Sequence, residues 1–288
     1  MFIQNDAKIG IKHGQLSIKN NRDILIPLED IATILIESPQ CSLSSYALGQ
    51  FAQKGITTIL CDQKRLPCGV LTPMNVNSRQ LKMINVQMGL TKPLKKRIWQ
   101  RIVVQKILNQ AKCLDIHTKD GADILRQLSK RVDSGDTSNV EAVAATKYFR
   151  FLFGNRFLRG QNDVINAAMN YGYSIIRSLI ARQICSYGFT PCIGIHHHNE
   201  LNNFNLADDL IEPFRALVDS FVFNNFSQEE VELTSDSKIT LFNLVNYEMT
   251  ISDKKYSVHT AITHYIRTFM SACKESNAAI LELPALTQ

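Results

Sequence analysis

The sequence predicts an α+β protein, with a small β-rich N-terminal domain followed by a larger all-α C-terminal domain. Short runs of alternating and β-branched residues fill residues 1–72, a pattern that is typical of strands. From about residue 79 onward, apolar residues recur at helical spacing instead. The polar, turn-rich segment PMNVNS (73–78) separates the two patterns. We therefore expect a linker over 73–79 and a helical domain over 80–288.

The N-terminal strands are predicted from alternation and from turn residues. His13-Gly14 lies between two alternating runs, 9–11 and 16–18, and this arrangement is typical of a hairpin. Ser42 is expected to cap a short helix that Gly55 ends. The remaining predicted strands cover residues 24–27, 31–36, 56–61 and 68–71.

The helices of the C-terminal part are predicted from their caps and their periodicity. A long helix should begin at Asn162 or Asp163 and end before Gly188, with Gly172 inside it where close backbone packing is expected. Another should begin near Leu206. Two more are expected near 239–247 and 257–273, followed by a loose tail over the last dozen residues.

Composition excludes several classes of protein. The 288 residues include seven cysteines with no C-x-x-C pair, which indicates free thiols in a reducing compartment. The N-terminus lacks the pattern of a signal peptide, and no apolar run approaches the roughly 18 residues that span a bilayer. We therefore expect a soluble, cytoplasmic protein with no membrane contact. The net charge of +6 fits a polyanionic partner.

Two groups of basic residues are candidates for contacts with DNA phosphates. The segment KPLKKRIWQR (92–101) opens a helix, and further arginines follow a later one. The alternative is that these side chains form an ordinary solvated helix face, which lysines and arginines commonly do. The candidates are Lys95, Lys96, Arg97, Arg101, Arg156 and Arg159.

A stretch rich in histidines and carboxylates, residues 193–219, is the strongest candidate for chemistry. An imidazole followed by carboxylates one helical turn apart could bind a divalent cation. The alternatives are a solvated His tract and an acidic helix start that complements the helix dipole. The side chains concerned are His196, His197, His198, Asp208, Asp209 and Glu212.

Four ordered motifs together resemble a known family. They read EAVAATKYF from Glu141, NDVINAAMNYGY (162–173), YGFTPCIGIHH (187–197) and LADDLIEPFR (206–215). Their order is similar to that of the CRISPR-associated endonuclease and integrase that inserts new spacers, the first-numbered Cas protein of the adaptation module. The resemblance extends over essentially the whole chain. It implies the same β-rich and α-helical arrangement.

The resemblance also implies a site. Its three metal ligands match Glu141, then His197 at three residues after Gly194, and then Glu212 at three residues after Asp209. In having Glu at the last of these positions, the chain resembles relatives from CRISPR systems with a single large RNA-guided effector, the type II-like systems. The cofactor implied is Mg²⁺ or Mn²⁺. Neighbours that could orient these ligands are Asp208, Asp209 and His196.

Partners follow from the same resemblance. It implies a homodimer, with two dimers bridged by the small second Cas adaptation protein to form a heterohexamer. The substrate implied is double-stranded DNA with single-stranded ends, joined into a CRISPR array by attack of a 3′-hydroxyl. Two alternatives stay open from the residues themselves. One is a catalytically inactive DNA-binding scaffold of the same assembly, and the other is an unrelated metal hydrolase that acts on small molecules. Glu141 also has a purely structural alternative, because Ser138 and Glu141 fit a helix capping box.

Overall fold

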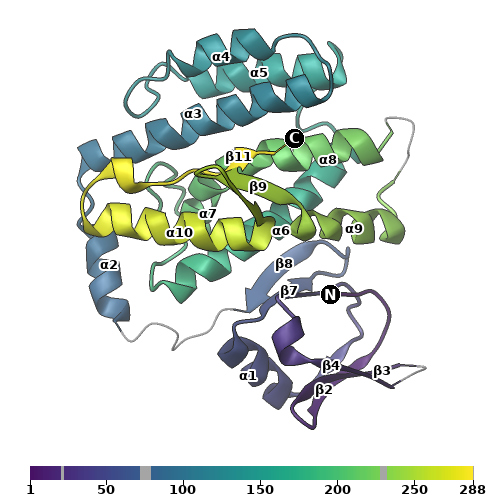
Figure 1. Ribbon diagram of the computed structural model, residues 1–288. Coiled ribbons are helices and arrows are strands. Elements are labelled where there is room, and N and C mark those ends of the chain that lie inside the picture. The colour runs from purple at the N-terminus through teal and green to yellow at the C-terminus, as the bar shows by residue number, and fades with distance from the viewer. Residues whose placement is uncertain (21–22, 72–78, 228–231, 288) are drawn as a thin grey trace.

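A computed structural model describes residues 1–20, 23–71, 79–227 and 232–287 (Figure 1). Strands concentrate in the N-terminal part, and helices make up most of the rest, as predicted. The N-terminal strands are β1 (Phe2–Ile3), β2 (Lys8–Lys12), β3 (Gln15–Lys19), β4 (Asp23–Pro27), β5 (Thr33–Ile36), β6 (Ser42–Leu43), β7 (Thr57–Cys61) and β8 (Pro67–Leu71).

The N-terminal strands form two four-stranded sheets around helix α1 (Ser45–Lys54). Their orders are β1-β5-β7-β8 and β4-β3-β2-β6. The hairpin between β2 and β3 turns at His13 and Gly14, where φ is 52° and 75°, so both residues are left-handed, as a type I′ hairpin turn requires. Gly55 ends α1 with a φ of 72°, as predicted. The expected cap was wrong by two residues: Ser44 caps α1, because Ser42 pairs within the sheet as part of β6.

The helical part contains nine α-helices among the described residues. Helix α6 lies at its centre and packs against the helices α7 to α10 and against β7 and β8 of the first N-terminal sheet (Figure 1). The helices are α2 (Gln80–Met88), α3 (Lys92–Ile116), α4 (Ala122–Ser129), α5 (Val140–Phe153), α6 (Val164–Ser186), α7 (Asn205–Leu210), α8 (Arg215–Asn225), α9 (Ser235–Phe242) and α10 (Val258–Lys274).

Close packing at Gly172 fixes the relation of α6 to its neighbours. A Cβ at this position would lie 2.6 Å from Cγ1 of Val218 on α8 and 3.2 Å from Cδ1 of Leu244. The prediction of close backbone packing at Gly172 is therefore confirmed. Asp163 caps α6, accepting from the backbone N–H of Asn166 at 2.7 Å.

The prediction of an all-α C-terminal domain was wrong. A three-stranded sheet of order β10-β9-β11 lies beside α10, formed by β9 (Glu248–Ile251), β10 (Lys254–Ser257) and β11 (Ala285–Leu286). Its hairpin turns at Ser252 and Asp253, whose φ values are 47° and 65°. This turn contains no glycine, so the sequence lacks the usual hairpin signal.

The expectation of a loose C-terminal tail was wrong as well. Leu281 and Leu286 are buried, and β11 pairs with β9. The backbone N–H of Leu286 also donates to Oδ1 of Asn109 on α3, at 3.1 Å. The chain end thus forms part of the core that α3 covers.

The predicted linker 73–79 lies, except for Arg79, outside the described residues, so the division into two domains stays a prediction. Leu35 and Ile59 of the first sheet belong to the same hydrophobic core as the helices. In the described part of the chain, no helix is both long and apolar enough to span a bilayer.

Candidate metal centre

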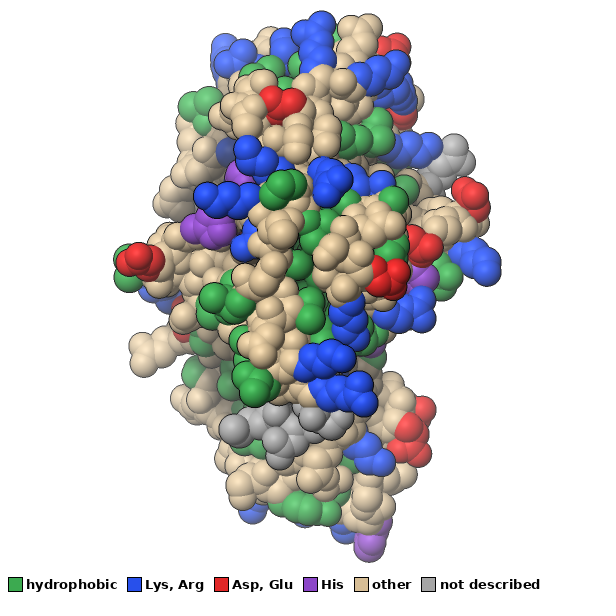
Figure 2. Space-filling view, turned by 90° about the vertical axis from the view of Figure 1, so that its left-hand side faces the viewer, with side chains coloured by type: hydrophobic (Ala, Val, Ile, Leu, Met, Phe, Trp, Pro, Cys, Tyr) green, Lys and Arg blue, Asp and Glu red, His purple; other side chains and the backbone are tan. Residues whose placement is uncertain are grey.

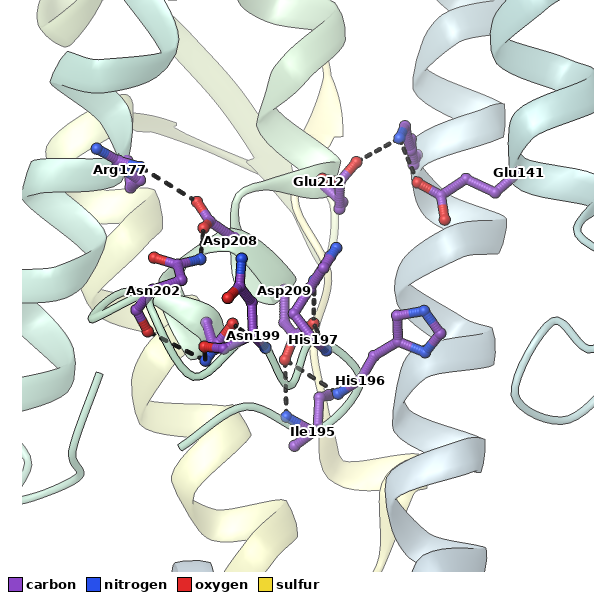
Figure 3. Close-up of polar contacts among 12 residues, drawn as sticks. Glu141, Arg177, Ile195, His196, His197, Asn199, Asn202, Asp208, Asp209 and Glu212 are labelled. Atoms are coloured by element: carbon purple, nitrogen blue, oxygen red, sulfur yellow. Dashed lines mark hydrogen bonds and ion pairs between the residues drawn. The ribbon is translucent and has the colours of Figure 1, made fainter. Parts of the chain in front are cut away.

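The loop between α6 and α7 is held by one buried carboxylate. Asp209, on α7, accepts the backbone N–H groups of Ile195, His196 and His197 at 2.7, 3.1 and 3.0 Å. Its Oδ1 also lies 2.7 Å from Nδ1 of His197 (Figure 3). An ionised carboxylate only accepts hydrogen bonds, so Nδ1 carries the proton and Nε2 of the neutral ring keeps its lone pair. This hydrogen bond raises the pKa of His197 above its usual value, and the charge of Glu212 adds to the effect.

Gly194 and Asn205 explain why the loop can close around Asp209. A Cβ on Gly194 would lie 2.3 Å from the carbonyl oxygen of His197 and 2.8 Å from Oδ2 of Asp209, so only glycine fits. The Asn205 amide donates to the carbonyl of Asn199 at 2.9 Å, and its Oδ1 accepts from the N–H of the same residue at 3.2 Å. These contacts fix the loop on α7.

Glu212 lies in a buried turn between α7 and α8. Pro213 follows it and turns the chain into a single 3₁₀ turn, η2 (Glu212–Phe214), which aims the Glu212 side chain inward. Nε of Arg215 donates to Oε1 of Glu212 at 2.7 Å, and Oε2 pairs with the ammonium of Lys106. Burial alone would raise the pKa of Glu212, but Arg215 and Lys106 outweigh it and lower that pKa to about 2. Glu212 is therefore ionised.

Glu141 lies in the first turn of α5, and the capping-box alternative for it was wrong. The side chain of Asp136 caps this helix, accepting the N–H groups of Val140 and Glu141 at 2.9 and 3.0 Å. Ser138 donates its hydroxyl to Asp133 instead of capping the helix. The Glu141 carboxylate is thus available for other contacts. It lies 2.5 Å from Nζ of Lys106.

Lys106, on α3, brings the two carboxylates together. Its buried ammonium forms ion pairs with both Glu141 and Glu212, which face each other from α5 and η2 (Figure 3). Helix α3 also anchors η2, because Asn109 donates to the carbonyl oxygen of Pro213 at 2.7 Å. Sequence reasoning missed Lys106. Lys106 is one of several lysines in α3 and gives no signal of its own, and only the fold shows that its position faces two carboxylates.

The neighbours of His197 have separate roles. The His196 ring stacks on Trp99 of α3, with centroids 4.1 Å apart and planes 4° from parallel. Asp208 pairs with Asn202 at 2.7 Å and with Arg177 at 3.7 Å. Of the two candidates to orient His197 from α7, only Asp209 has a contact with it among the described interactions.

The predicted basic residues divide into tied and exposed side chains. Arg101 donates to the carbonyl of Leu281 at 2.8 Å, and Arg159 donates to Asn170 at 2.9 Å. Lys95 is half-buried, whereas the side chains of Lys96, Arg97 and Arg156 are exposed. Figure 2 shows blue Lys and Arg side chains recurring over the helical part of one face, with His side chains among them.

The chemistry of these residues suits a divalent cation, although their side chains are not gathered into a cluster of three ligands. Among residues 1–20, 23–71, 79–227 and 232–287, no three His, Cys, Asp or Glu side chains form a ready metal cluster. Glu141 and Glu212 already share one cation, the ammonium of Lys106. The His197 ring presents Nε2 with its tautomer fixed by Asp209, an arrangement common in metal-binding histidines. Two carboxylates and one imidazole suit Mg²⁺ or Mn²⁺.

Comparisons with known proteins identify a family. The family described as CRISPR associated protein Cas1 matches residues 1–241. The CRISPR-associated endonuclease Cas1 of Neisseria meningitidis serogroup C is 41% identical over 290 residues, covering 99% of this chain and 95% of its own.

Solved structures agree in fold. A casposase bound to its integration product aligns with a TM-score of 0.78 at 18% identity, covering 96% of this chain and 91% of that one. A chain of a Cas6-RT-Cas1–Cas2 complex aligns with a TM-score of 0.74 at 17% identity, covering 100% of this chain and 36% of that one. At such identities the likeness concerns the fold alone. The sequence matches go further, and by them the chain is a member of the CRISPR-associated protein Cas1 family.

Proposed function

We propose that this protein is a metal-dependent DNA endonuclease and integrase, which inserts short foreign DNA into a CRISPR array during adaptive antiviral defence. One observation carries the proposal: Glu141 and Glu212, from separate elements, converge on a single positive charge close to the loop of His197. The name of the Neisseria relative, an endonuclease, supports cleavage. The casposase bound to an integration product supports strand transfer on this fold.

The ligands proposed for Mg²⁺ or Mn²⁺ are Glu141, Glu212 and Nε2 of His197. The bound ion would stabilise charge on the scissile phosphate and orient or activate the nucleophile. Asp209 holds His197 in the tautomer that can coordinate, and Arg215 keeps Glu212 ionised. In transfer, a DNA 3′-hydroxyl forms a new P–O bond as the bond to the leaving strand breaks. Water in the same place gives cleavage.

Proposed partners are DNA with a double-stranded body and single-stranded ends, a second copy of this chain, and the small Cas2 protein in a heterohexamer. The Cas6-RT-Cas1–Cas2 complex supports the Cas2 partner. Physical support for dimerisation comes from edge strand β4, where Ile24 and Leu25 are exposed. Exposed Lys96, Arg97 and Arg156 are the proposed phosphate contacts.

The test is cleavage and strand transfer on branched DNA with Mn²⁺, comparing Glu141→Gln, Glu212→Gln and His197→Ala with wild type. Each should abolish both reactions, with DNA binding and the circular dichroism spectrum retained. The matched controls are Glu200→Gln, an exposed Glu of the same loop, and His196→Ala, which should cost less than His197→Ala. A folded Glu141→Gln protein that cuts at the wild-type rate would exclude this site.

A second candidate function is a catalytically inactive DNA-binding scaffold. The position of Lys106 favours it, because a buried ammonium occupies the space between the two carboxylates. A scaffold of this kind would bind DNA but would bind no Mn²⁺ in isothermal titration calorimetry. Saturable Mn²⁺ binding that Glu212→Gln removes would exclude it.

A further inference from the structure

The ammonium of Lys106 lies where the two carboxylates of the proposed metal site meet. Its Nζ is 2.5 Å from Oε1 of Glu141 and forms a second ion pair with Oε2 of Glu212. Only 9% of the Lys106 side chain is exposed. Removing two carboxylates from water is unfavourable unless a positive charge compensates them. In the metal-free protein, Lys106 supplies that charge.

The charges around the site balance without a metal. Two carboxylates, Glu141 and Glu212, face two cations, Lys106 and Arg215. Arg215 pairs with Oε1 of Glu212, whereas Lys106 pairs with Oε2 of Glu212 and also with Glu141. A divalent cation bound between the same oxygens would therefore repel the ammonium at close range.

The lysine can leave without moving the helix that carries it. Helix α3 is fixed on both sides of the site, by Trp99 stacked on His196 and by Asn109 bonded to the carbonyl of Pro213. A lysine side chain has a flexible four-carbon stem, so its head can swing away while its Cα stays in place.

We propose that Lys106 is an internal counter-cation, which holds Glu141 and Glu212 ready in the metal-free protein and is displaced by the divalent cation. This inference rests on the proposed metal-dependent function. If Lys106 acts in this way, metal binding competes with an intramolecular ion pair. The state with Lys106 in place lowers the apparent affinity for metal, because only the fraction with Lys106 displaced is competent to bind.

The test is Mn²⁺ binding to the full chain without DNA, by isothermal titration calorimetry. Lys106→Gln and Lys106→Met should bind Mn²⁺ about tenfold more tightly than wild type, if about nine-tenths of the wild-type molecules have the ion pair formed. Their Tm should also rise more on adding Mn²⁺, because binding to the folded state alone stabilises it. Lys147→Met is the matched control, because Lys147 is exposed on α5, the helix that carries Glu141. The Lys147→Met protein should bind Mn²⁺ like wild type.

Equal or weaker Mn²⁺ binding by a folded Lys106→Gln protein would overturn the inference. It would mean that Lys106 does not compete with the ion in the wild-type protein. If neither wild type nor a Lys106 variant bound Mn²⁺, the proposed metal-dependent function would fail, and this inference with it. If neither Lys106 variant folds, acetylation of the wild-type protein decides. Labelling of Lys106, measured by mass spectrometry, should rise several-fold when Mg²⁺ is added, and unchanged labelling would overturn the inference.

Discussion

Nδ1 of His197 lies 2.7 Å from Oδ1 of Asp209, a carboxylate with no exposed surface. The same carboxylate accepts the backbone N–H groups of the loop that carries the histidine. One side chain thus fixes the position, the ring orientation and the tautomer of His197. The family motif alone identifies the histidine but does not show how its ring is held.

Asp209→Asn should therefore weaken the proposed metal site. The amide presents an N–H group to backbone donors and can no longer match all of them, so the His197 ring loses its fixed orientation. We expect metal affinity to fall by about 10- to 100-fold. Mn²⁺ titration measures the loss. Asp208→Asn is the matched control, because Asp208 pairs with Asn202 and Arg177 instead, and an equal loss in both variants would contradict the role of Asp209.

The exposed basic residues of α3 should contribute to DNA binding through phosphates. Lys96→Ala combined with Arg97→Ala removes two exposed charges. If both contact phosphates, the slope of log affinity against log salt should become flatter by about 1.8, at about 0.9 per contact on duplex DNA. Fluorescence anisotropy at several salt concentrations measures this slope. An unchanged affinity and slope would show that these residues form only a solvated helix face.

Gly172 should be intolerant of alanine, unlike Gly49. Alanine at 172 would press against Val218 and Leu244, and overpacking costs about 1–3 kcal/mol. That cost should exceed the helix-propensity gain of about 1 kcal/mol. Gly49 in α1 has no atom within 4 Å of its added Cβ, so Gly49→Ala should stabilise the fold instead. Urea denaturation measures both, and a stabilised Gly172→Ala protein would contradict the packing argument.

Local signals in the sequence predicted much of the fold. The hairpin at His13-Gly14 and the start of α6 after Asp163 both depend on residues close in sequence, and both are confirmed. The hairpin at Ser252-Asp253 was missed because its turn has left-handed residues without glycine. The strand β11 was missed because two residues have no periodicity, and only pairing with β9 makes them a strand.

The site was predictable in part, for the same reason. Motifs predicted Glu141, His197 and Glu212 as ligands, and the fold brings the two carboxylates onto one ammonium. Lys106 could not be assigned from sequence, because its role depends on which helices lie side by side, whereas the pairing of Arg215 with Glu212 is a local contact three residues apart. Ser138 and Glu141 match the capping-box spacing, but Asp136, from two residues further back, takes the capping role. A spacing motif names a possible contact, and tertiary competition decides which contact forms.

Asp219 on α8 should make stability depend on pH, through a carboxyl that is not one of the proposed ligands. Its carboxyl is buried, which raises its pKa from 3.8 to about 6, although Tyr173 donates a hydrogen bond that acts in the opposite direction. The groups that act on it or on which it acts are Tyr173, Tyr148, Arg159, Arg215 and Cys113.

The sign follows from which state holds the proton more tightly. Because the pKa is higher in the folded chain, folded molecules bind more protons between about pH 4 and pH 6, and the free energy of unfolding contributed by Asp219 falls as pH rises through that window. The loss is about 3 kcal/mol for a shift of about two units.

Asp219→Asn keeps an oxygen that accepts from Tyr173 and does not titrate. The unfolding free energy of Asp219→Asn minus that of wild type should therefore increase by about 3 kcal/mol from about pH 4 to about pH 7, as measured by urea denaturation. Asp253→Asn, at an exposed turn position that asparagine also adopts, is the matched replacement for comparison. A difference for Asp219→Asn that stays constant with pH would show that the buried carboxyl is ionised across the whole range.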